Sequence, residues 1–187
     1  MFKVLLTILI VFPFLQSFAQ DKLPLEISEQ VTTLKQELKA ASNDSLKIVI
    51  TSDLGDLYFD YNSDSAIVYT LKSIELINTT NKKSHFLTQY KARNLYNLGD
   101  IYSYNGHDNN GITNLKESLQ LFRQINDSIG EADCLGNIGS IYEMQGNIGL
   151  ALDFLNKSLS LSKTINYKES IALNLNDIAF IYTAQGH

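Results

Sequence analysis

The feature that most constrains the fold is a five-residue motif that returns at a fixed interval. An aliphatic residue, a small residue, a variable residue, an aliphatic residue and a tyrosine occupy 98–102, 138–142 and 178–182, which gives a period of 40 residues. A weaker copy at 54–58 lies 44 residues before the first of these. A fixed period of this length is typical of architectures in which each unit buries its apolar face against its neighbours.

Each unit contains two amphipathic helices. Ala92, Leu95, Leu98 and Tyr102 follow steps of three and four, which place them on one stripe of a helix, and the same stripe recurs one and two periods later. A second apolar stripe follows each of the first three motifs, for example over 151–159. The pattern predicts an all-α fold built from antiparallel helix hairpins.

Small residues predict where the two helices of a hairpin touch. Gly99 and Gly139 hold the small position of the motif, although glycine inside a helix costs roughly 1 kcal/mol relative to alanine. Their recurrence therefore indicates close helix packing. Left-handed turns are expected at the ends of the first helices, at Gly106, Gly146 and Gly186, with Asn62 in the same role in the first unit.

Capping residues predict where the helices begin. Ser128 with Glu131, and Asn166 with Glu169, have the spacing of a capping box at the start of a first helix. Apolar residues at helical spacing behind Pro24 predict an N-terminal capping helix within 20–41. The expected organisation is a repeat array over 42–187, with units at 42–83, 84–127, 128–166 and an incomplete unit at 167–187.

These residues resemble the tetratricopeptide repeat family over about residues 42–187. The family order of bulky residue, leucine, glycine and tyrosine is matched by Leu95, Leu98, Gly99 and Tyr102, and again by Leu135, Ile138, Gly139 and Tyr142, with Ala151 and Ser158 in the alanine positions of the second helix. No tryptophan opens the motif and no proline ends the second helix, and the period resembles a long-helix subgroup found in bacterial regulators and motor light chains. The resemblance implies a right-handed superhelical solenoid whose concave surface receives peptides or helices.

With that geometry, polar first-helix residues beside the packing stripe line a peptide-binding groove. Amide side chains can hydrogen-bond a peptide backbone whatever its sequence, which favours this role. The alternative is that the asparagines only tie neighbouring helices together. Chaperone-binding members of the family clamp a terminal carboxylate with Lys and Arg, a ligand not predicted here because only Arg93 could serve. The candidate groove residues are Asp53, Asp56, Arg93, Asn97, Asp100, Tyr104, Asn137, Ser140, Met144, Asn176 and Asp177.

No catalytic, metal or cofactor site is expected. His107 and His187 directly follow turn glycines of different units, so they should be exposed and far apart. Cys134 lies in a helix without a nearby histidine and is expected to be buried. The glycines follow the repeat and form no phosphate-binding loop, and an enzyme would need convergent titratable residues outside the repeat register.

Residues 1–19 have the pattern of a signal peptide. Lys3 gives a basic start, an apolar run follows over 4–15, and Ser17 and Ala19 place small residues two apart before a cleavage site. Cleavage after Ala19 predicts an exported protein, periplasmic if the source is a Gram-negative bacterium. The alternative is an uncleaved membrane anchor facing the periplasm, although about 12 apolar residues are few for ~30 Å of hydrocarbon.

Charge bears on the class of partner. The formal net charge is -5 and the pI is near 5.1, whereas nucleic-acid surfaces need clustered Lys and Arg that this composition lacks. We therefore expect a protein or peptide partner and no nucleic acid.

The array is expected to be incomplete, because the fourth first helix at 167–184 is followed by turn residues and no second helix. Solenoids normally end in a polar capping helix, so the chain is interpreted as the N-terminal part of a longer protein. Two functional hypotheses use the same groove. One is an exported scaffold that binds protein or peptide. The other is the periplasmic sensory region of a membrane histidine kinase or transcriptional regulator, whose output domain would lie beyond residue 187.

Overall fold

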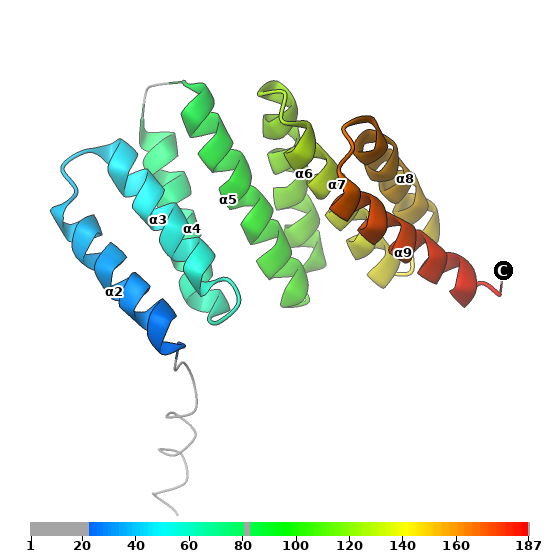
Figure 1. Cartoon of the computed structure of the whole chain (residues 1–187), viewed down its shortest axis with the longest axis horizontal. Coiled ribbons are helices and arrows are strands. Elements are labelled where there is room, and N and C mark those ends of the chain that lie inside the picture. The colour runs from blue at the N-terminus through cyan, green and yellow to red at the C-terminus, as the bar shows by residue number, and fades with distance from the viewer. Residues whose placement is uncertain (1–22, 81–82, 187) are drawn as a thin grey trace, which may run out of the picture.

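The computed structural model describes residues 23–80 and 83–186, so the expected signal peptide at 1–19 lies outside the described residues. Within them the chain forms eight α-helices arranged as a curved row (Figure 1). These are α2 (Leu25–Ala40), α3 (Asp44–Tyr58), α4 (Ser63–Thr79), α5 (His85–Tyr104), α6 (Asp108–Gln124), α7 (Ser128–Met144), α8 (Ile148–Thr164) and α9 (Lys168–Ala184).

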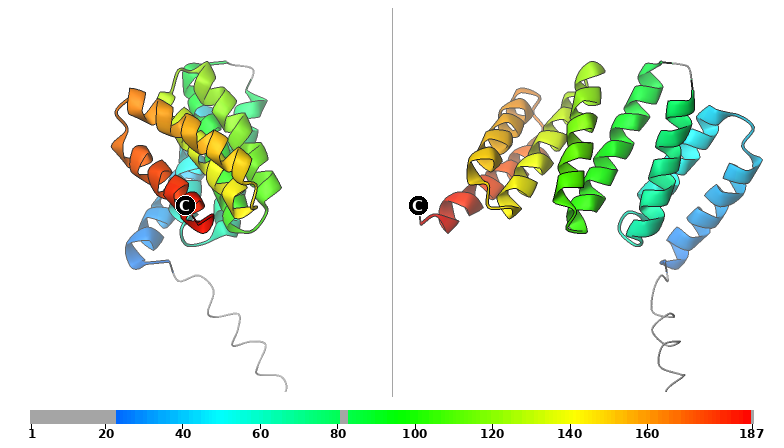
Figure 2. Two further views of the ribbon diagram at one scale, coloured as in Figure 1. Left: turned by 90° about the vertical axis from the view of Figure 1, so that its right-hand side faces the viewer. Right: turned by 180° about the vertical axis from the view of Figure 1, so that it is seen from behind.

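Consecutive helices pair into hairpins, α3 with α4, α5 with α6 and α7 with α8, while α9 packs on α7 and α8. The first helices α3, α5, α7 and α9 also contact one another in that order. They form one side of the row, and α4, α6 and α8 form the other side (Figure 2). The predicted all-α solenoid of antiparallel helix hairpins is therefore confirmed.

Close packing inside the hairpins explains the motif glycines. A Cβ added at Gly99 would lie 2.5 Å from Leu115 Cγ, and one added at Gly139 would lie 2.7 Å from Leu155 Cγ. Both distances are far below a normal carbon contact, so a larger side chain would push the two helices of the hairpin apart. The position needs glycine because the leucine of the second helix occupies the space that a side chain would take.

The turn between the helices of a hairpin follows the prediction in the later units. Gly106, Gly146 and Gly186 have φ of 75°, 73° and 81°, the left-handed region in which a side chain is strained. Asn62 was expected to take the same role, and this prediction is wrong. Its backbone is extended, with φ of -154°, and its side chain instead caps α4 by accepting from the Ser65 N–H at 2.7 Å.

The connections between hairpins differ from the predicted capping boxes. The N-cap of α7 is Asp127, whose carboxylate accepts from the Gly130 N–H at 3.0 Å, and Ser128 is the first helical residue. Asn166 does not begin α9. It has φ of 57° and ends α8 in a left-handed turn, as Asn126 with φ of 58° ends α6. Asparagine is common both as an N-cap and in this conformation, which is why its spacing to Glu169 was misleading.

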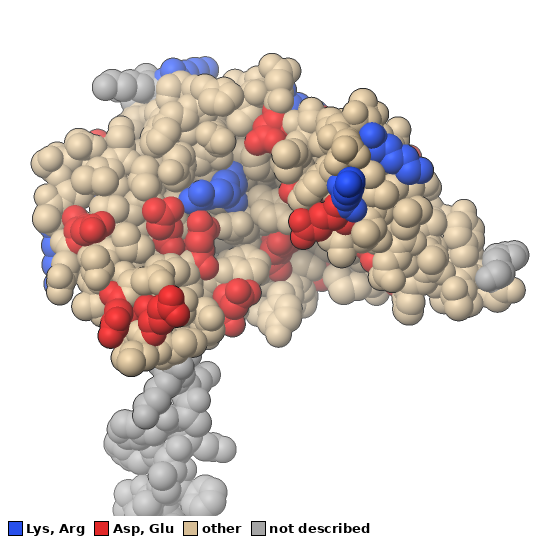
Figure 3. All heavy atoms as spheres, in the orientation of Figure 1, with Lys and Arg blue, Asp and Glu red and all other residues tan. Residues whose placement is uncertain are grey.

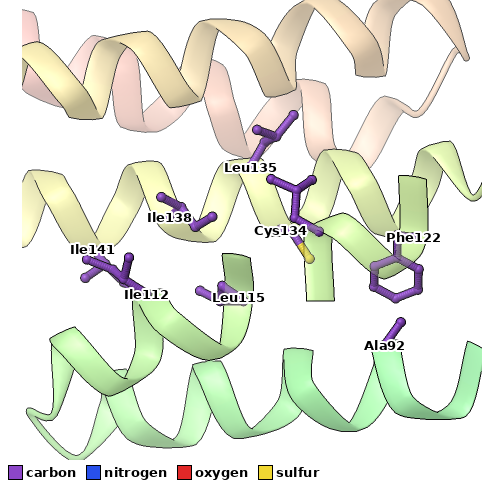
Figure 4. Packing of buried hydrophobic residues seen from close by; sticks show 9 residues of the cluster. Ala92, Ile112, Leu115, Phe122, Cys134, Leu135, Ile138 and Ile141 are labelled. Carbon is purple, nitrogen blue, oxygen red and sulfur yellow. The ribbon is translucent and has the colours of Figure 1, made fainter. Parts of the chain in front are cut away.

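The largest apolar cluster of the described residues joins α5, α6 and α7 (Figure 4). Leu115 and Phe122 from α6 lie between Ala92 of α5 and Leu135 and Ile138 of α7. Phe122 packs so closely on α7 that a Cβ at Gly130 would lie 2.5 Å from its ring. The apolar core therefore continues across the unit boundary between α6 and α7, which makes the row continuous.

Helix α9, the first helix of the fourth unit, has an exposed apolar face. Leu95 and Leu135 are only 5 % and 3 % exposed, whereas Leu175, at the same register position, is 47 % exposed. The reason is that α6 and α8 cover this face on α5 and α7, while the described chain has no helix after α9. In the part of the chain that the structure describes, no helix is long and apolar enough to cross a membrane.

Candidate peptide-binding groove

The predicted groove residues lie on the first helices, which line one broad face of the solenoid. Acidic side chains gather on this face over the α2, α3 and α5 half, with one basic patch among them, and the surface recedes toward its centre (Figure 3). The helices bring these residues together because the same register recurs 44 residues on from α3 to α5, and 40 residues on from α5 to α7 and from α7 to α9.

Hydrogen bonds between the same two register positions join consecutive first helices. The bonded pairs are Asn97 with Asp56 at 2.6 Å, Asn137 with Asp100, and Ser140 with Asp177 at 2.7 Å. Asn97, Asn137 and Asp177 occupy equivalent positions in their units, and so do Asp56, Asp100 and Ser140. Each bond joins one residue of the first set to one residue of the second. The asparagines donate through Nδ2, so they tie neighbouring helices together. We call these three pairs the groove ladder.

Arg93 on α5 is turned toward α3. Its Nη2 lies 3.2 Å from Asp53 Oδ1 and 3.0 Å from Asp56 Oδ2, and it donates to Ser52 Oγ at 2.9 Å. The guanidinium carbon also lies 4.9 Å from the ring centre of Tyr90, within cation–π range. Two carboxylates of the protein therefore neutralise the charge of Arg93, so its guanidinium is not free to bind the terminal carboxylate of a peptide.

Asp100 is a largely desolvated carboxyl in the groove ladder. Burial raises its pKa to about 6, and hydrogen bonds donated by the Asn137 amide and the Tyr96 hydroxyl act in the opposite sense. Asn137 Nδ2 also donates to Tyr96 Oη at 3.0 Å, which links the three side chains. Both donors are neutral, so the ionised form of Asp100 has hydrogen bonds but no counter-charge from them.

Asp133 on α7 is a groove residue that the sequence reasoning missed. Burial raises its pKa to about 6, the hydrogen bond from Tyr167 lowers it, and the negative charges of Asp127 and Glu169 raise it further. Asp133 stands at the register position of Arg93, so the charge at this position changes sign from α5 to α7. The burial and the neighbours that raise its pKa come from packing, which the pattern within α7 does not contain.

A cavity of about 300 Å³ opens between α5, α6 and α7, beside the groove ladder. Of the predicted residues, Arg93 and Asn97 border it. Its walls also include Gln89, Tyr96, Phe122, Ile129 and Asp133. Phe122 of α6 and Ile129 at the start of α7 were not predicted, because they lie outside the register of the groove residues.

Three predicted residues belong neither to the groove ladder nor to the contacts of Arg93. Tyr104 and Met144 are exposed near the ends of α5 and α7, and Asn176 is exposed on α9. Tyr104 borders a separate cavity of about 390 Å³ with Phe59 and Tyr61 at the α3–α4 turn. The structure therefore brings most of the predicted set together along the ladder and leaves these three at its margins.

The other titratable candidates have structural surroundings. Cys134 is fully buried, its Sγ lies 3.4 Å from Ser118 Oγ, and burial raises the pKa of the thiol to about 12. His85 and His107 are exposed at helix starts, and His187 lies outside the described residues. Among described residues, no three His, Cys, Asp or Glu side chains are grouped so as to hold a metal ion.

Comparison with known sequence families gives two matches along the chain. A family described as tetratricopeptide repeat matches residues 90–164, and one described as SusR N-terminal TPR domain matches residues 26–89. The chain belongs to the tetratricopeptide repeat family. Such repeats generally mediate protein–protein interactions, and the fold is generally non-catalytic.

Among solved structures, a Signal Transduction ATPase with Numerous Domains protein with a tetratricopeptide repeat sensor, from Pyrococcus horikoshii, is similar with a TM-score of 0.72. The two chains are 20% identical, so the likeness concerns the fold alone. The match covers 85% of this chain and 24% of that chain, so this tetratricopeptide repeat chain spans about a quarter of its neighbour's length. A search of curated proteins gives no match.

Proposed function

We propose that the face formed by α3, α5, α7 and α9 is a groove that binds an extended segment of another protein. The observation that supports the proposal is the cavity of about 300 Å³ beside the groove ladder. Its walls combine the aromatic rings of Tyr96 and Phe122 with the carboxylate of Asp133. Apolar walls with a few polar groups that orient a ligand are the usual composition of a binding site.

The groove ladder limits how the peptide is held. Asn97 and Asn137 already donate through Nδ2 to Asp56 and Asp100. Their contribution to ligand binding therefore falls on the amide Oδ1 atoms, which accept hydrogen bonds from peptide N–H groups. This arrangement reads the peptide backbone, and selectivity for side chains comes from the cavity next to it.

The test is a selection of binding peptides from a random display library, followed by titration against two variants. Gln89→Trp places an indole at the mouth of the cavity, whereas Gln120→Trp adds the same bulk to an exposed position of α6 away from it. Selected peptides should bind Gln89→Trp at least about tenfold more weakly than the wild type, a loss of about 1.4 kcal/mol. Peptides that bind both variants equally well would place the binding surface elsewhere.

We also propose that the protein is exported and periplasmic, with residues 1–19 removed. The proposal rests on the basic start, the apolar run and the small residues at 17 and 19. N-terminal sequencing of the protein made in a Gram-negative host should give a chain that begins at Gln20. A chain that begins at Met1 and fractionates with the membrane would support the uncleaved anchor instead.

A second candidate function is the periplasmic sensory region of a longer signalling protein. Support comes from the neighbour, which is named as having a tetratricopeptide repeat sensor and of whose chain the match covers 24%, and from the match to a SusR N-terminal TPR domain. Reading the gene past codon 187 tests it. Further repeats, about 20 apolar residues and an output domain would support it, and a genuine stop codon at 188 would count against it.

A further inference from the structure

The groove carries an unbalanced charge. The first helices place Asp53, Asp56, Asp100, Asp133 and Asp177 along it, and the basic residue among the candidate residues is Arg93. The second helices α4, α6 and α8 together carry five acidic and five basic residues, so their charges balance. The excess negative charge therefore concentrates on the face that we propose binds a ligand.

Pairing within the protein does not remove this excess. Arg93 is shared between Asp53 and Asp56. For Asp100 and Asp133, no Lys, Arg or His nitrogen of residues 23–80 and 83–186 lies within 4.0 Å. Their hydrogen-bond partners are the neutral groups of Asn137, Tyr96 and Tyr167. Both carboxylates are partly desolvated, so a cation brought to them would gain more than it would at an exposed acid.

The cavity at Asp133 combines the two features that a basic side chain requires, which are apolar walls for its stem and a carboxylate for its cation. Tyr96, Phe122 and Ile129 provide apolar walls along which an aliphatic stem can lie. Asp133 provides the negative charge at the wall, and Asp127 lies on the same cavity. The faces of aromatic rings also attract cations, which adds to the preference.

We propose that the ligand of the groove is a basic protein segment, which inserts one Lys or Arg side chain into the cavity between α5 and α7 with its cation against Asp133. This inference rests on the groove being the binding surface and adds the chemistry of its partner. An acidic segment is disfavoured because its carboxylates would face five aspartates, and the one guanidinium among the candidate residues is already paired.

Binding of such a segment should displace protons. The titratable and charged groups around Asp133 are Asp127 at the start of α7, Tyr167 and Glu169 at the start of α9, and Asp100 and Arg93 on α5. The hydrogen bond from the Tyr167 hydroxyl lowers the pKa of Asp133, whereas the charges of Asp127 and Glu169 raise it. An added cation acts in the opposite sense, and complex formation near pH 6 should therefore release protons, which a purely apolar ligand would not do.

The experiment uses the full purified chain and two labelled probes. One is a short peptide in which lysine alternates with leucine and serine, and the other has glutamate in place of every lysine. Fluorescence anisotropy compares the wild type with Asp133→Asn and with the control Asp153→Asn, which changes the net charge equally on an exposed site of α8. The lysine peptide should bind, and Asp133→Asn should weaken it at least about tenfold while Asp153→Asn changes it little.

A charge reversal separates a direct contact from a structural effect. Asp133→Arg should bind the glutamate peptide more tightly than the wild type does, which mere damage to the groove would not produce. Equal binding of the two peptides by the wild type, or equal losses in Asp133→Asn and Asp153→Asn, would overturn the basic ligand. If the lysine peptide does not bind but Gln89→Trp still weakens the binding of display-selected peptides, the groove remains supported and the basic ligand is excluded. If neither depends on the cavity, both proposals fall.

Discussion

At the scale of the residue, the glycines of this protein have opposite roles that the sequence alone does not separate. Gly139 faces Leu155 so closely that a Cβ would lie 2.7 Å from its Cγ and 3.1 Å from its backbone N. At Gly149, in the first turn of α8, no atom beyond the adjacent residues and the nearby backbone of α8 lies within 4 Å of the place where a Cβ would stand. Both lie in helices, so the difference comes from packing and not from backbone conformation.

Alanine substitutions should therefore have opposite effects. Gly149→Ala should stabilise the fold by up to about 1 kcal/mol, because alanine is the better helix former and nothing obstructs its methyl group. Gly139→Ala should destabilise it by about 1–3 kcal/mol, since overpacking of the hairpin exceeds that gain. Urea unfolding followed by circular dichroism measures both. A stabilised Gly139→Ala would mean that the hairpin relaxes at little cost.

The two raised aspartates give stability an unusual dependence on pH. The pKa of Asp100 and that of Asp133 are raised to about 6 by burial, whereas aspartate in an unfolded chain titrates near 3.9. Between about pH 4 and about pH 6 the folded protein binds more protons than the unfolded chain, so the free energy of unfolding from these groups falls as pH rises. Urea titrations across this range should show the fall, and the Asp100→Asn/Asp133→Asn variant should be flatter. A variant as steep as the wild type would assign the effect to other groups.

A residue could be foreseen where its type allows a single role in the repeat. Gly106 and Gly146 were predictable as turn residues because few other residues adopt positive φ. Asn126 and Asn166 hold the same conformation, but asparagine also caps helices, so its type did not decide between the two roles. Asp133 was not predicted because its cavity and its raised pKa depend on how α6 and α9 pack against α7, which the residues of α7 alone do not reveal.

At the scale of the element, the first helices share one pattern but differ in what covers them. The stripe that contains Leu95, Leu135 and Leu175 predicts the same burial for all three. The structure buries the first two under α6 and α8 and leaves Leu175 half exposed. Periodicity identifies which face of a helix is apolar, whereas burial depends on a neighbour that a pattern within the helix does not contain.

This difference predicts unequal costs for one substitution at equivalent positions. Leu135→Ala should lower the free energy of unfolding by about 2–5 kcal/mol, because it opens a cavity in the main core. Leu175→Ala should cost less than about 1 kcal/mol, as at a half-exposed site. The two variants carry the same chemical change, so each is the other's control. A large loss at Leu175 would show that the face of α9 is covered in solution.

At the scale of the whole molecule, stability is expected to be highest near the middle of the row. In a solenoid it is approximately the sum of unit stabilities and contacts between neighbours, so each end lacks one set of contacts. The main apolar cluster joins α5, α6 and α7, whereas α2 buries only Val31 among its described residues. In α9 the buried residues are Ser170, Asn174 and Ile181, of which one is apolar.

Native-state hydrogen exchange followed by mass spectrometry measures this gradient helix by helix. Amide protection should be greatest in α5, α6 and α7 and least in α2 and α9, because local opening at the ends exposes little apolar surface. The Leu135→Ala variant is the control, since a loss in the central cluster should reduce protection on both sides of α7 together. Protection of α9 equal to that of α7 would contradict the gradient, and it would mean that the open apolar face of α9 is occupied in the molecule as it exists in solution.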